Sequence, residues 1–506
     1  MDKNLQYRRQ FLLAKAPVPL LDHWQRLSFA EYHLYTHPDL EVCSLSDGRR
    51  HLVLIGYLFD AAHAEKGNSE ILGDISARAR SLDELLLRIK RYAGRYAFLY
   101  KDQSRCVVLH DALALREVYY CTTPNLVVCG SQPNLLAKYS SPAIGISTDS
   151  ELLEFHAKHL RGCSWVGDQT YYEHVKHLLP NHCLDLQNLL AFRYWPNEPI
   201  KPLPLDEAVR RACEFLQGTM HAVTHRYRVM MAVTAGTDTR TLLAASRHLR
   251  DNIHFFINKE RDLNDRSPDI RVPRAMFREL GIPFHVHTVS PEVDSHFKEV
   301  FLGNTFFASE RILPTIYNVY FKEHSDKVNI LGIGEIGRTR WGKEPRTLNS
   351  YRLAYALGYK DSNYVRRICR EVLAEVLPVG RRFGINVMTL VYWEQRLGNW
   401  GAVGNSESDI AIEEFDPFDS HSLYETLLGV DEKWSKYSRP TVFREMILHM
   451  WPELLNWPVN PPGTLRDGVA WLLKRCGLYG ALREAKYQAN YMRYRWLADC
   501  ADYHYG

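Results

Sequence analysis

The segment from Met230 to Leu242 constrains the fold most, because an apolar run passes through a small, hydroxyl-rich turn into a helix start. Residues 229–234 are typical of a buried strand, and Thr234-Ala235-Gly236-Thr237-Asp238-Thr239 has the composition of a tight turn. The first N–H groups of a helix lack intrahelical partners and carry the positive end of its dipole, so they attract anions. We therefore predict a phosphate-binding turn. The alternative is an ordinary strand–turn–helix connection with a Thr N-cap.

The turn has side chains suited to a nucleotide. Ala235 and Gly236 allow close approach of the backbone, Thr234 and Thr239 offer hydroxyls, and the Asp238 carboxylate is a ligand for Mg²⁺. The segment matches neither the Walker pattern nor G-x-G-x-x-G, so an ordinary P-loop or dinucleotide fold is not indicated.

The remainder of the chain predicts a soluble protein of two domains. It has 506 residues, of which 46% are hydrophobic and 24% charged, and its net charge of +4 gives no case for a nucleic-acid surface. No apolar run is long enough to span a membrane, and residues 1–10 do not form a signal peptide. The ten cysteines follow no metal or disulfide spacing, so we expect buried thiols in a cytoplasmic protein.

Two patterns divide the chain at a proline-rich joint, residues 196–204. Before it, apolar runs at 51–59, 96–100, 106–109 and 126–129 predict stacked antiparallel sheets, with helices at 81–92 and 149–159. The predicted domains are therefore residues 1–196, an α+β sandwich, and residues 205–506.

The second half alternates helices and strands, which predicts a doubly wound parallel sheet. A helical cap is expected beyond about residue 347. The expected helices are 205–224, 239–249 and 268–280, and the expected strands are 229–234, 253–258, 284–288 and 328–332. Ligands of such sheets bind beyond the carboxyl ends of strands, so the 234–239 turn and Gly332-Ile333-Gly334-Glu335 are expected to face one crevice.

Six motifs in a fixed order resemble the asparagine synthetase family. In that family a glutaminase-like domain of the Ntn-hydrolase type precedes an ATP-pyrophosphatase domain, similar to the adenine nucleotide alpha hydrolases. The motifs are Gly94–Asp102 (GRYAFLYKD), Asp111–Tyr120 (DALALREVYY), Cys129-Gly130-Ser131, Leu179-Pro180-Asn181-His182, Arg193-Tyr194-Trp195 and the 234–239 turn, which resembles S-G-G-x-D-S.

The resemblance implies an ATP-dependent, amide-forming ligase that activates a carboxylate as an acyl-adenylate and releases AMP and pyrophosphate. ATP and Mg²⁺ are the implied cofactors, with Asp238 and Glu335 as metal ligands. Glu335 and Arg338 are the implied catalytic residues, Arg338 taking up pyrophosphate charge together with Arg340. The implied nucleotide-binding residues are Val233, Thr234, Ala235, Gly236, Thr237, Asp238, Thr239, Ile257, Gly332 and Gly334, with adenine near Val233 and Ile257.

The chain departs from the family first in its source of nitrogen. Members that hydrolyse glutamine use an N-terminal cysteine, whereas this chain begins Met1-Asp2 and its first cysteine is Cys43. β-Lactam synthetases and lasso-peptide cyclases show the same loss and use an amine of the substrate. We therefore expect ammonia or a substrate amine as the nucleophile. A glutamine-dependent asparagine synthetase with an unrecognised glutaminase arrangement is an alternative.

Two further departures lie in the synthetase half. The family's S-G-x-G-x-D-E becomes Leu331–Gly337, in which the acidic position has moved by one residue to Glu335. The family's R-x-K corresponds to Trp451–Pro461, which holds no lysine. Lys433, Lys436, Arg439 and Arg444 are candidates to supply the missing cation. The family's E-x-R-x-P-F-L-D resembles residues 413–419 without the arginine.

The motifs and the departures are compatible with three functions: the ligase, a catalytically degenerate binding or regulatory module of the same fold, and a nucleic-acid-modifying ATP-pyrophosphatase. The low net charge disfavours the third. The expected partners are ATP and a carboxylate-bearing small molecule, sugar or peptide, without nucleic acid or membrane, and a homodimer is compatible with them. His285 and His287 alternate on one strand, but no H-E-x-x-H or cysteine accompanies them, so we interpret them as structural, hydrogen-bonded residues rather than zinc ligands.

Overall fold

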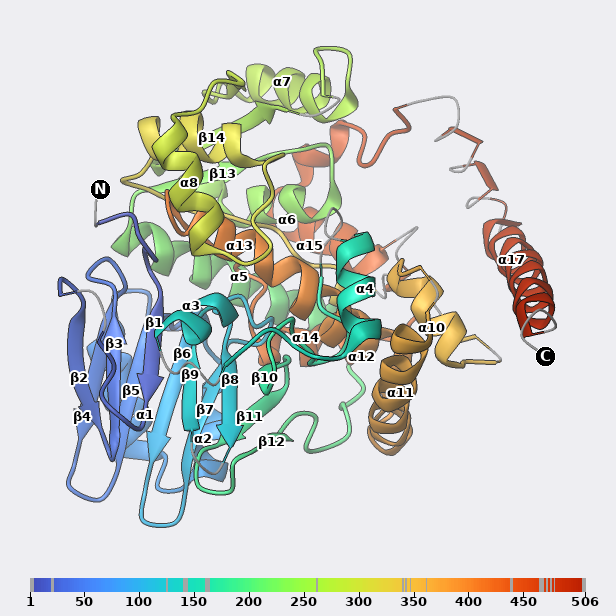
Figure 1. Ribbon diagram of the computed structural model, residues 1–506. Helices are drawn as coiled ribbons and strands as arrows, with labels where there is room; N and C mark the ends of the chain where they lie inside the picture. Colours follow the sequence, from blue (N-terminus) through green and yellow to red (C-terminus); the bar gives the residue numbers. More distant parts are fainter. Residues whose placement is uncertain are drawn as a thin grey trace.

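The computed structural model has antiparallel sheets in its first half and a parallel sheet in its second (Figure 1). The described residues are 4–19, 22–123, 126–139, 144–159, 164–260, 263–338, 341, 344–345, 347–360, 362–436, 440–463, 468–469, 472–473, 476 and 478–502. Among these, no helix combines the length and apolarity that a bilayer span requires.

Two six-stranded antiparallel sheets stack face to face in the first half, as the alternation of apolar runs predicts. The first sheet has the order β10 (Val175–His177), β8 (Tyr119–Thr123), β9 (Leu126–Gly130), β1 (Phe11–Ala14), β3 (Tyr32–Thr36) and β2 (Gln25–Phe29). The second has the order β12 (Leu190–Arg193), β11 (His182–Asp185), β7 (Cys106–His110), β6 (Ala93–Lys101), β5 (His51–Phe59) and β4 (Val42–Ser46). Apolar side chains of both sheets, among them Leu13, Leu34, Ile55 and Leu99, form the core between them. The helices of this half are α1 (Asn68–Arg78), α2 (Leu82–Ile89), α3 (Pro133–Tyr139) and α4 (Ser150–His159).

A five-stranded parallel sheet organises the second half. Its order is β15 (His285–Thr288), β14 (Ile253–Lys259), β13 (Val229–Ala232), β16 (Val328–Ile330) and β17 (Glu413–Phe415). Met231 and Phe255 on one face join the core formed with α5, α6 and α15, and Met230 and Phe256 on the other face pack near α8. Helices therefore cover both faces, as in a doubly wound sheet.

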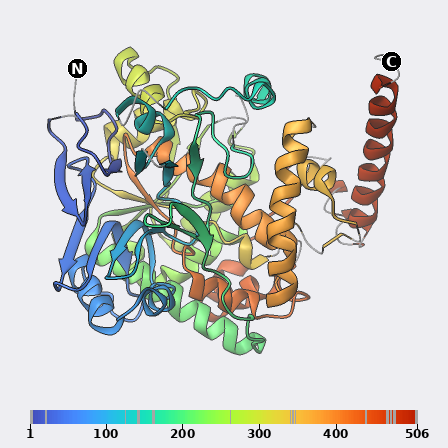
Figure 2. The ribbon, with the colours of Figure 1, turned by 60° about the horizontal axis from the view of Figure 1, so that its bottom comes forward.

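In the second half, helices first alternate with strands, as expected. Beyond β16 the chain is mainly helical. The chain order is α5 (Leu205–Arg226), α6 (Thr237–Ala245), α7 (Pro268–Leu280), α8 (Ser295–Asn304), α9 (Leu313–Thr315), α10 (Ser350–Leu357), α11 (Asn363–Phe383), α12 (Val387–Val391), α13 (Ala402–Ser408), α14 (His421–Leu428), α15 (Thr441–Met450) and α17 (Leu478–Asp502). Short 3-10 helices lie at Arg247–Asn252, Ile336–Arg338 and Pro452–Asn456, and π-helical stretches at Ile316–Phe321 and Tyr392–Gly401. In both views α17 stands apart from the body, near α10 (Figures 1 and 2).

The described cysteines are mostly buried, but two differ from that expectation, because Cys43 is half-buried and Cys476 is exposed.

The two halves share one continuous interior. A single apolar cluster runs from Leu58 and Phe98 in the first half to Leu216, Val233 and Phe443 in the second. Apolar burial on both sides of the joint therefore stabilises the two halves together.

Buried charges also cross this interface. Arg95, which is fully buried, donates two hydrogen bonds to the Asp409 carboxylate, at 2.7 and 2.9 Å, and one to Glu413 at 3.0 Å. Arg116 also donates to Glu413. Glu413 is the first residue of β17 and Asp409 lies shortly before it, so the sandwich directly positions one edge of the parallel sheet.

A second buried group at the interface is the Glu117 carboxyl. It accepts hydrogen bonds from the Tyr119 hydroxyl at 2.6 Å, from Gln132 Nε2 at 2.8 Å and from the Ser406 hydroxyl. Burial outweighs these donors and raises the pKa of Glu117 from its ordinary value of 4.5 to about 7. The group is therefore protonated in the folded protein at mildly acidic pH.

We expect the Glu117→Gln variant to be stabilised relative to the parent above neutral pH. Folded Glu117 keeps its proton where the unfolded chain has lost it, so stability present at low pH is lost as the pH rises through about 7. At 1.36 kcal/mol per pKa unit the loss amounts to about 3 kcal/mol. Thermal unfolding at about pH 4 and about pH 8, which lie outside the two pKa values, measures it. The exposed Glu31→Gln variant is the control, and equal pH dependence of parent and Glu117→Gln would contradict the prediction.

Candidate functional site

The predicted crevice lies where the order of the parallel strands reverses. The chain passes from β13 to β14 on one side and later returns to place β16 on the other side of β13. The connections after β13 and β16 therefore leave neighbouring carboxyl ends in opposite directions, and such a switch point is the usual ligand site of an open parallel sheet.

The two loops are in direct contact there. A Cβ atom added to Gly334 would lie 2.7 Å from Asp238 Oδ1, and one added to Gly332 would lie 3.4 Å from Asp238 Cβ. Larger residues at Gly334 would displace the Asp238 carboxylate. The structure thus brings Gly332, Gly334 and Asp238 together, although they lie about a hundred positions apart in the sequence, a separation read from their numbering.

Internal hydrogen bonds shape the 234–239 turn. Thr234 N–H donates to Thr239 Oγ1 at 3.2 Å, and Gly236 N–H donates to Thr234 Oγ1 at 3.0 Å. Helix α6 begins at Thr237 with Gly236 as N-cap, two residues earlier than the sequence pattern predicts, because the threonine hydroxyls satisfy the turn. The N–H groups of Thr237, Asp238 and Thr239 then form the first helical turn.

The expected adenine contacts sit at neighbouring strand ends. Val233 N–H donates to the Phe256 carbonyl at 2.9 Å, which continues the pairing of β13 with β14. Val233 and Ile257 are both buried. Their side chains therefore contribute to the apolar interior beside the turn.

Asp269, at the start of α7, accepts a hydrogen bond from one of the backbone amides of the 234–239 turn. Its Oδ1 accepts a hydrogen bond from Ala235 N–H at 3.0 Å. A carboxylate thus lies where we expected phosphate oxygen. The sequence analysis did not identify Asp269. The pattern that could have revealed it is an acidic residue in the first turn of the helix that follows the neighbouring strand β14.

We expect Asp269→Ala to bind phosphate more tightly. Removing an anion from a helix N-terminal site frees the Ala235 amide and removes repulsion, which at 0.3–1 kcal/mol gives about a 2- to 5-fold gain in affinity. Titration of ATP or inorganic phosphate measures it. Asp206→Ala, which removes an exposed acid from the first turn of α5, should leave the affinity unchanged, and weaker binding by Asp269→Ala would exclude competition by this carboxylate.

Arg338 pairs with Asp238, the residue expected to hold Mg²⁺. Its Nη2 donates to Asp238 Oδ2, and both side chains are buried. Arg338 ends the short 3-10 helix Ile336–Arg338, where its N–H donates to the Glu335 carbonyl at 3.1 Å, and its guanidinium lies over the Phe443 ring. Arg338 is therefore directed at a carboxylate in this structure, whereas the resemblance implies a role toward pyrophosphate. Arg340 lies outside the described residues.

Asp416 adds a third carboxyl group to the site. It follows β17, and its Oδ2 accepts a hydrogen bond from Ile333 N–H at 2.9 Å. Burial raises the pKa of Asp416 well above its usual range, and the negative charges of Asp238 and Glu335 add to the effect. The sequence analysis includes Asp416 in the 413–419 motif but gives it no role, because it does not predict β17 as a fifth strand.

The segment expected at the place of R-x-K covers the turn. Asn460 N–H donates to the Ala235 carbonyl at 2.8 Å, and Asn460 Nδ2 donates to Thr237 Oγ1 at 2.9 Å. The buried Arg240 guanidinium ties the same segment to α6 through the carbonyl of Leu454 at 2.7 Å. An amide side chain therefore touches the turn from this segment.

Four basic residues were candidates to replace the lysine of the family's R-x-K. Those that the structure describes lie at the surface. Lys433 pairs with Asp431 at 3.2 Å, and Arg444 pairs with Glu445 at 3.3 Å. Lys436 is exposed, and Arg439 lies outside the described residues.

Cysteines of the sandwich core have unreactive thiols. Cys106, Cys129 and Cys183 are fully buried. Burial raises the pKa of Cys106 to about 12, so its thiolate form is scarce at neutral pH.

No family model matches this sequence. No curated protein matches it either. Among solved structures it is similar to the allosteric regulatory enzyme of purine biosynthesis, with 12% identity, 56% of this chain and 75% of that chain covered, and a TM-score of 0.24. It is also similar to glutamine phosphoribosylpyrophosphate amidotransferase from B. subtilis complexed with ADP and GMP, with 11% identity, coverage of 58% and 65%, and a TM-score of 0.23.

Proposed function

We propose that this protein is an ATP-dependent, AMP-forming ligase that joins a carboxylate to ammonia or a substrate amine. The observation that carries the proposal is the meeting of the 234–239 turn, the Gly332–Glu335 loop and Asp416 at the switch point of a parallel sheet. A nucleotide phosphate chain needs such backbone amides, and its metal needs hard oxygen ligands.

The donor set fits Mg²⁺, because the carboxyl groups of Asp238, Glu335 and Asp416 are close enough for the charges of the first two to raise the pKa of the third, and a bound cation would favour the ionised form of all three. Bound Mg²⁺ would neutralise phosphate charge. The first-turn amides of α6 would hold phosphate oxygens, and Arg338 would turn from Asp238 to the departing pyrophosphate. The substrate carboxylate displaces pyrophosphate from ATP, and the amine then displaces AMP to form the amide.

Binding and chemistry are tested separately. Calorimetric titration with ATP and Mg²⁺ should give saturable binding that Asp238→Ala weakens at least about tenfold, or 1.4 kcal/mol. Pyrophosphate exchange into ATP, screened over amino, sugar and peptide carboxylates, then detects adenylation. The exposed Asp251→Ala variant is the control. An active exchange reaction that Asp238→Ala does not slow would contradict the assigned site.

The contacts of Asp238 and Ala235 favour a second candidate, a nucleotide-binding or regulatory module without catalysis. Arg338 and Asp269 already engage the carboxylate and an amide that the ligase needs, and the segment that corresponds to the family's R-x-K touches the turn through Asn460 and holds no lysine. ATP binding without exchange on any carboxylate would support the module. Exchange with even one carboxylate would exclude it.

A further inference from the structure

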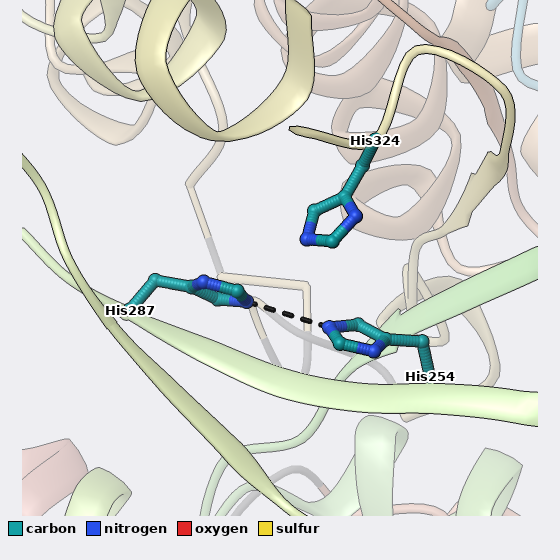
Figure 3. A group of neighbouring side chains, drawn as sticks. All are labelled: His254, His287 and His324. Atoms are coloured by element: carbon teal, nitrogen blue, oxygen red, sulfur yellow. Dashed lines mark hydrogen bonds between the residues drawn. The ribbon is translucent and has the colours of Figure 1, made fainter. Parts of the chain in front are cut away.

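Three histidines from separate elements converge on the face of the parallel sheet near α8. His254 lies on β14, His287 on the edge strand β15, and His324 between the π-helical stretch and β16. One ring nitrogen of each lies within 4.8 Å of the other two. Figure 3 shows the rings of His254 and His287 meeting edge to edge, with His324 turned toward them from above.

The spacing of these nitrogens is close to that of a metal site. His254 Nε2 and His287 Nε2 are 3.5 Å apart. Two imidazole nitrogens bound tetrahedrally at about 2.0–2.1 Å from zinc are about 3.4 Å apart. The separation of this pair therefore matches that of two zinc ligands. The two atoms share a hydrogen bond here, so metal binding replaces the shared proton and draws His324 closer.

Burial favours the neutral rings that metals bind. His324 is 8% exposed, and its Nε2 has no hydrogen-bond partner among the described residues. Desolvation, with repulsion from the neighbouring histidines, lowers the pKa of His254 to about 3. A ring without charge keeps a lone pair available.

One carboxylate stands beside the cluster. Glu323 Oε2 is 3.9 Å from His287 Nδ1 and 4.0 Å from His324 Nε2. A carboxylate near the second nitrogen of a metal-bound histidine orients the ring and raises its basicity. Glu323 can serve in this way or close the coordination sphere itself.

One cation opposes metal binding. Lys327 Nζ is 3.2 Å from His324 Nδ1 and 3.0 Å from Asp326 Oδ1. An ammonium group only donates, so this contact places the ring proton of neutral His324 on Nε2. Binding at Nε2 requires the contact to open, with Lys327 kept by Asp326.

We propose that His254, His287 and His324 form a binding site for a divalent transition-metal ion, with Zn²⁺ as the ion that three imidazoles and one oxygen ligand suit best. The bound ion ties the edge strand β15 to β14 and to the segment before β16. It is separate from the carboxylate-rich crevice, because His254 lies near the start of β14 and pairs with Met230 rather than with the turn.

The test uses the chain of 506 residues, stripped of metal with a chelator and titrated with CoCl₂ and ZnCl₂. We expect one equivalent of Co²⁺ to give the visible absorption of a tetrahedral site, Zn²⁺ to displace it, and Zn²⁺ to raise the Tm. Each of His254→Gln, His287→Gln and His324→Gln should weaken binding at least about tenfold, and Glu323→Gln about tenfold.

The controls separate this site from casual surface binding. His248→Gln removes an exposed histidine elsewhere and should bind as the parent does. Lys327→Met should bind more tightly, because it removes the opposing charge. If a histidine variant fails to fold, the Co²⁺ spectra of the parent and of Lys327→Met still test the proposal. Absence of the tetrahedral Co²⁺ spectrum in both, or binding indifferent to His287→Gln, overturns the proposal.

Discussion

Replacing Arg338 with methionine is expected to destabilise the protein by about 3–5 kcal/mol without Mg²⁺, because it removes one partner of a buried ion pair with Asp238. The same change opens Asp238 to a metal ion. We therefore expect Mg²⁺ to restore part of the lost stability and to bind the variant more tightly than the parent. Chemical denaturation with and without Mg²⁺ measures both effects.

The matched control is Arg444→Met, which removes an exposed arginine from the nearby helix α15. Exposed ion pairs contribute only about 0–1 kcal/mol, so its denaturation midpoint should hardly move. If Arg338→Met is destabilised and Mg²⁺ restores nothing, Asp238 is not a metal ligand.

Replacing Arg95 with leucine is expected to have at least as large an effect, about 3–5 kcal/mol or more. The guanidinium is fully buried and pairs with both Asp409 and Glu413, so its loss removes the main hydrogen-bonding cation of Asp409 and leaves both carboxylates to Arg116. The carbonyl of Leu115, which accepts from Arg95 Nε at 3.0 Å, also loses its donor. Chemical denaturation followed by tryptophan fluorescence measures the loss.

Two further variants define the cause. Arg105→Leu breaks a pair with Asp185 in which the arginine is half-exposed, and it should cost about 1 kcal/mol or less. Adding Asp409→Asn to Arg95→Leu removes the carboxylate charge that has lost both of its hydrogen bonds from Arg95, and should recover part of the stability. No recovery would show that lost packing, not charge, dominates.

Strongly periodic elements could be predicted from the sequence almost to the residue. The 51–59 strand and the 268–280 helix coincide with β5 and α7, because each is long and has clear end signals. β17, of three residues, gave no such signal, although it supplies Asp416. Short strands are fixed by their neighbours in the sheet rather than by their own pattern.

The sequence could predict only those parts of the candidate site that directly follow a predicted strand. The two glycine loops followed from strand ends, and the structure brings them together. Asp269 and His324 were missed, and Asn460 was included in the 451–461 segment without a role, because each gains its neighbours through tertiary contacts that leave no pattern in the sequence. His287, interpreted as structural, meets two histidines that lie 33 and 37 positions away in the numbering.

The motifs that carry the family resemblance mark an interface. Arg95 contacts Asp409, and Leu113 N–H donates to Asp419 at 3.0 Å. Asn181 Nδ2 and Arg193 both donate to Glu394. Their pattern in the sequence therefore reflects contact with the second half as well as the sandwich's own folding.

The shared apolar cluster and the buried Arg95 pairs determine how the molecule can move. Domains joined by a proline-rich linker are generally expected to hinge, but hinging here would expose apolar surface and strip arginine from two carboxylates. The two halves should behave as one rigid block. Any opening of the crevice then falls to its own loops, and changes in one half reach the other as small shifts of packed side chains rather than as rotation.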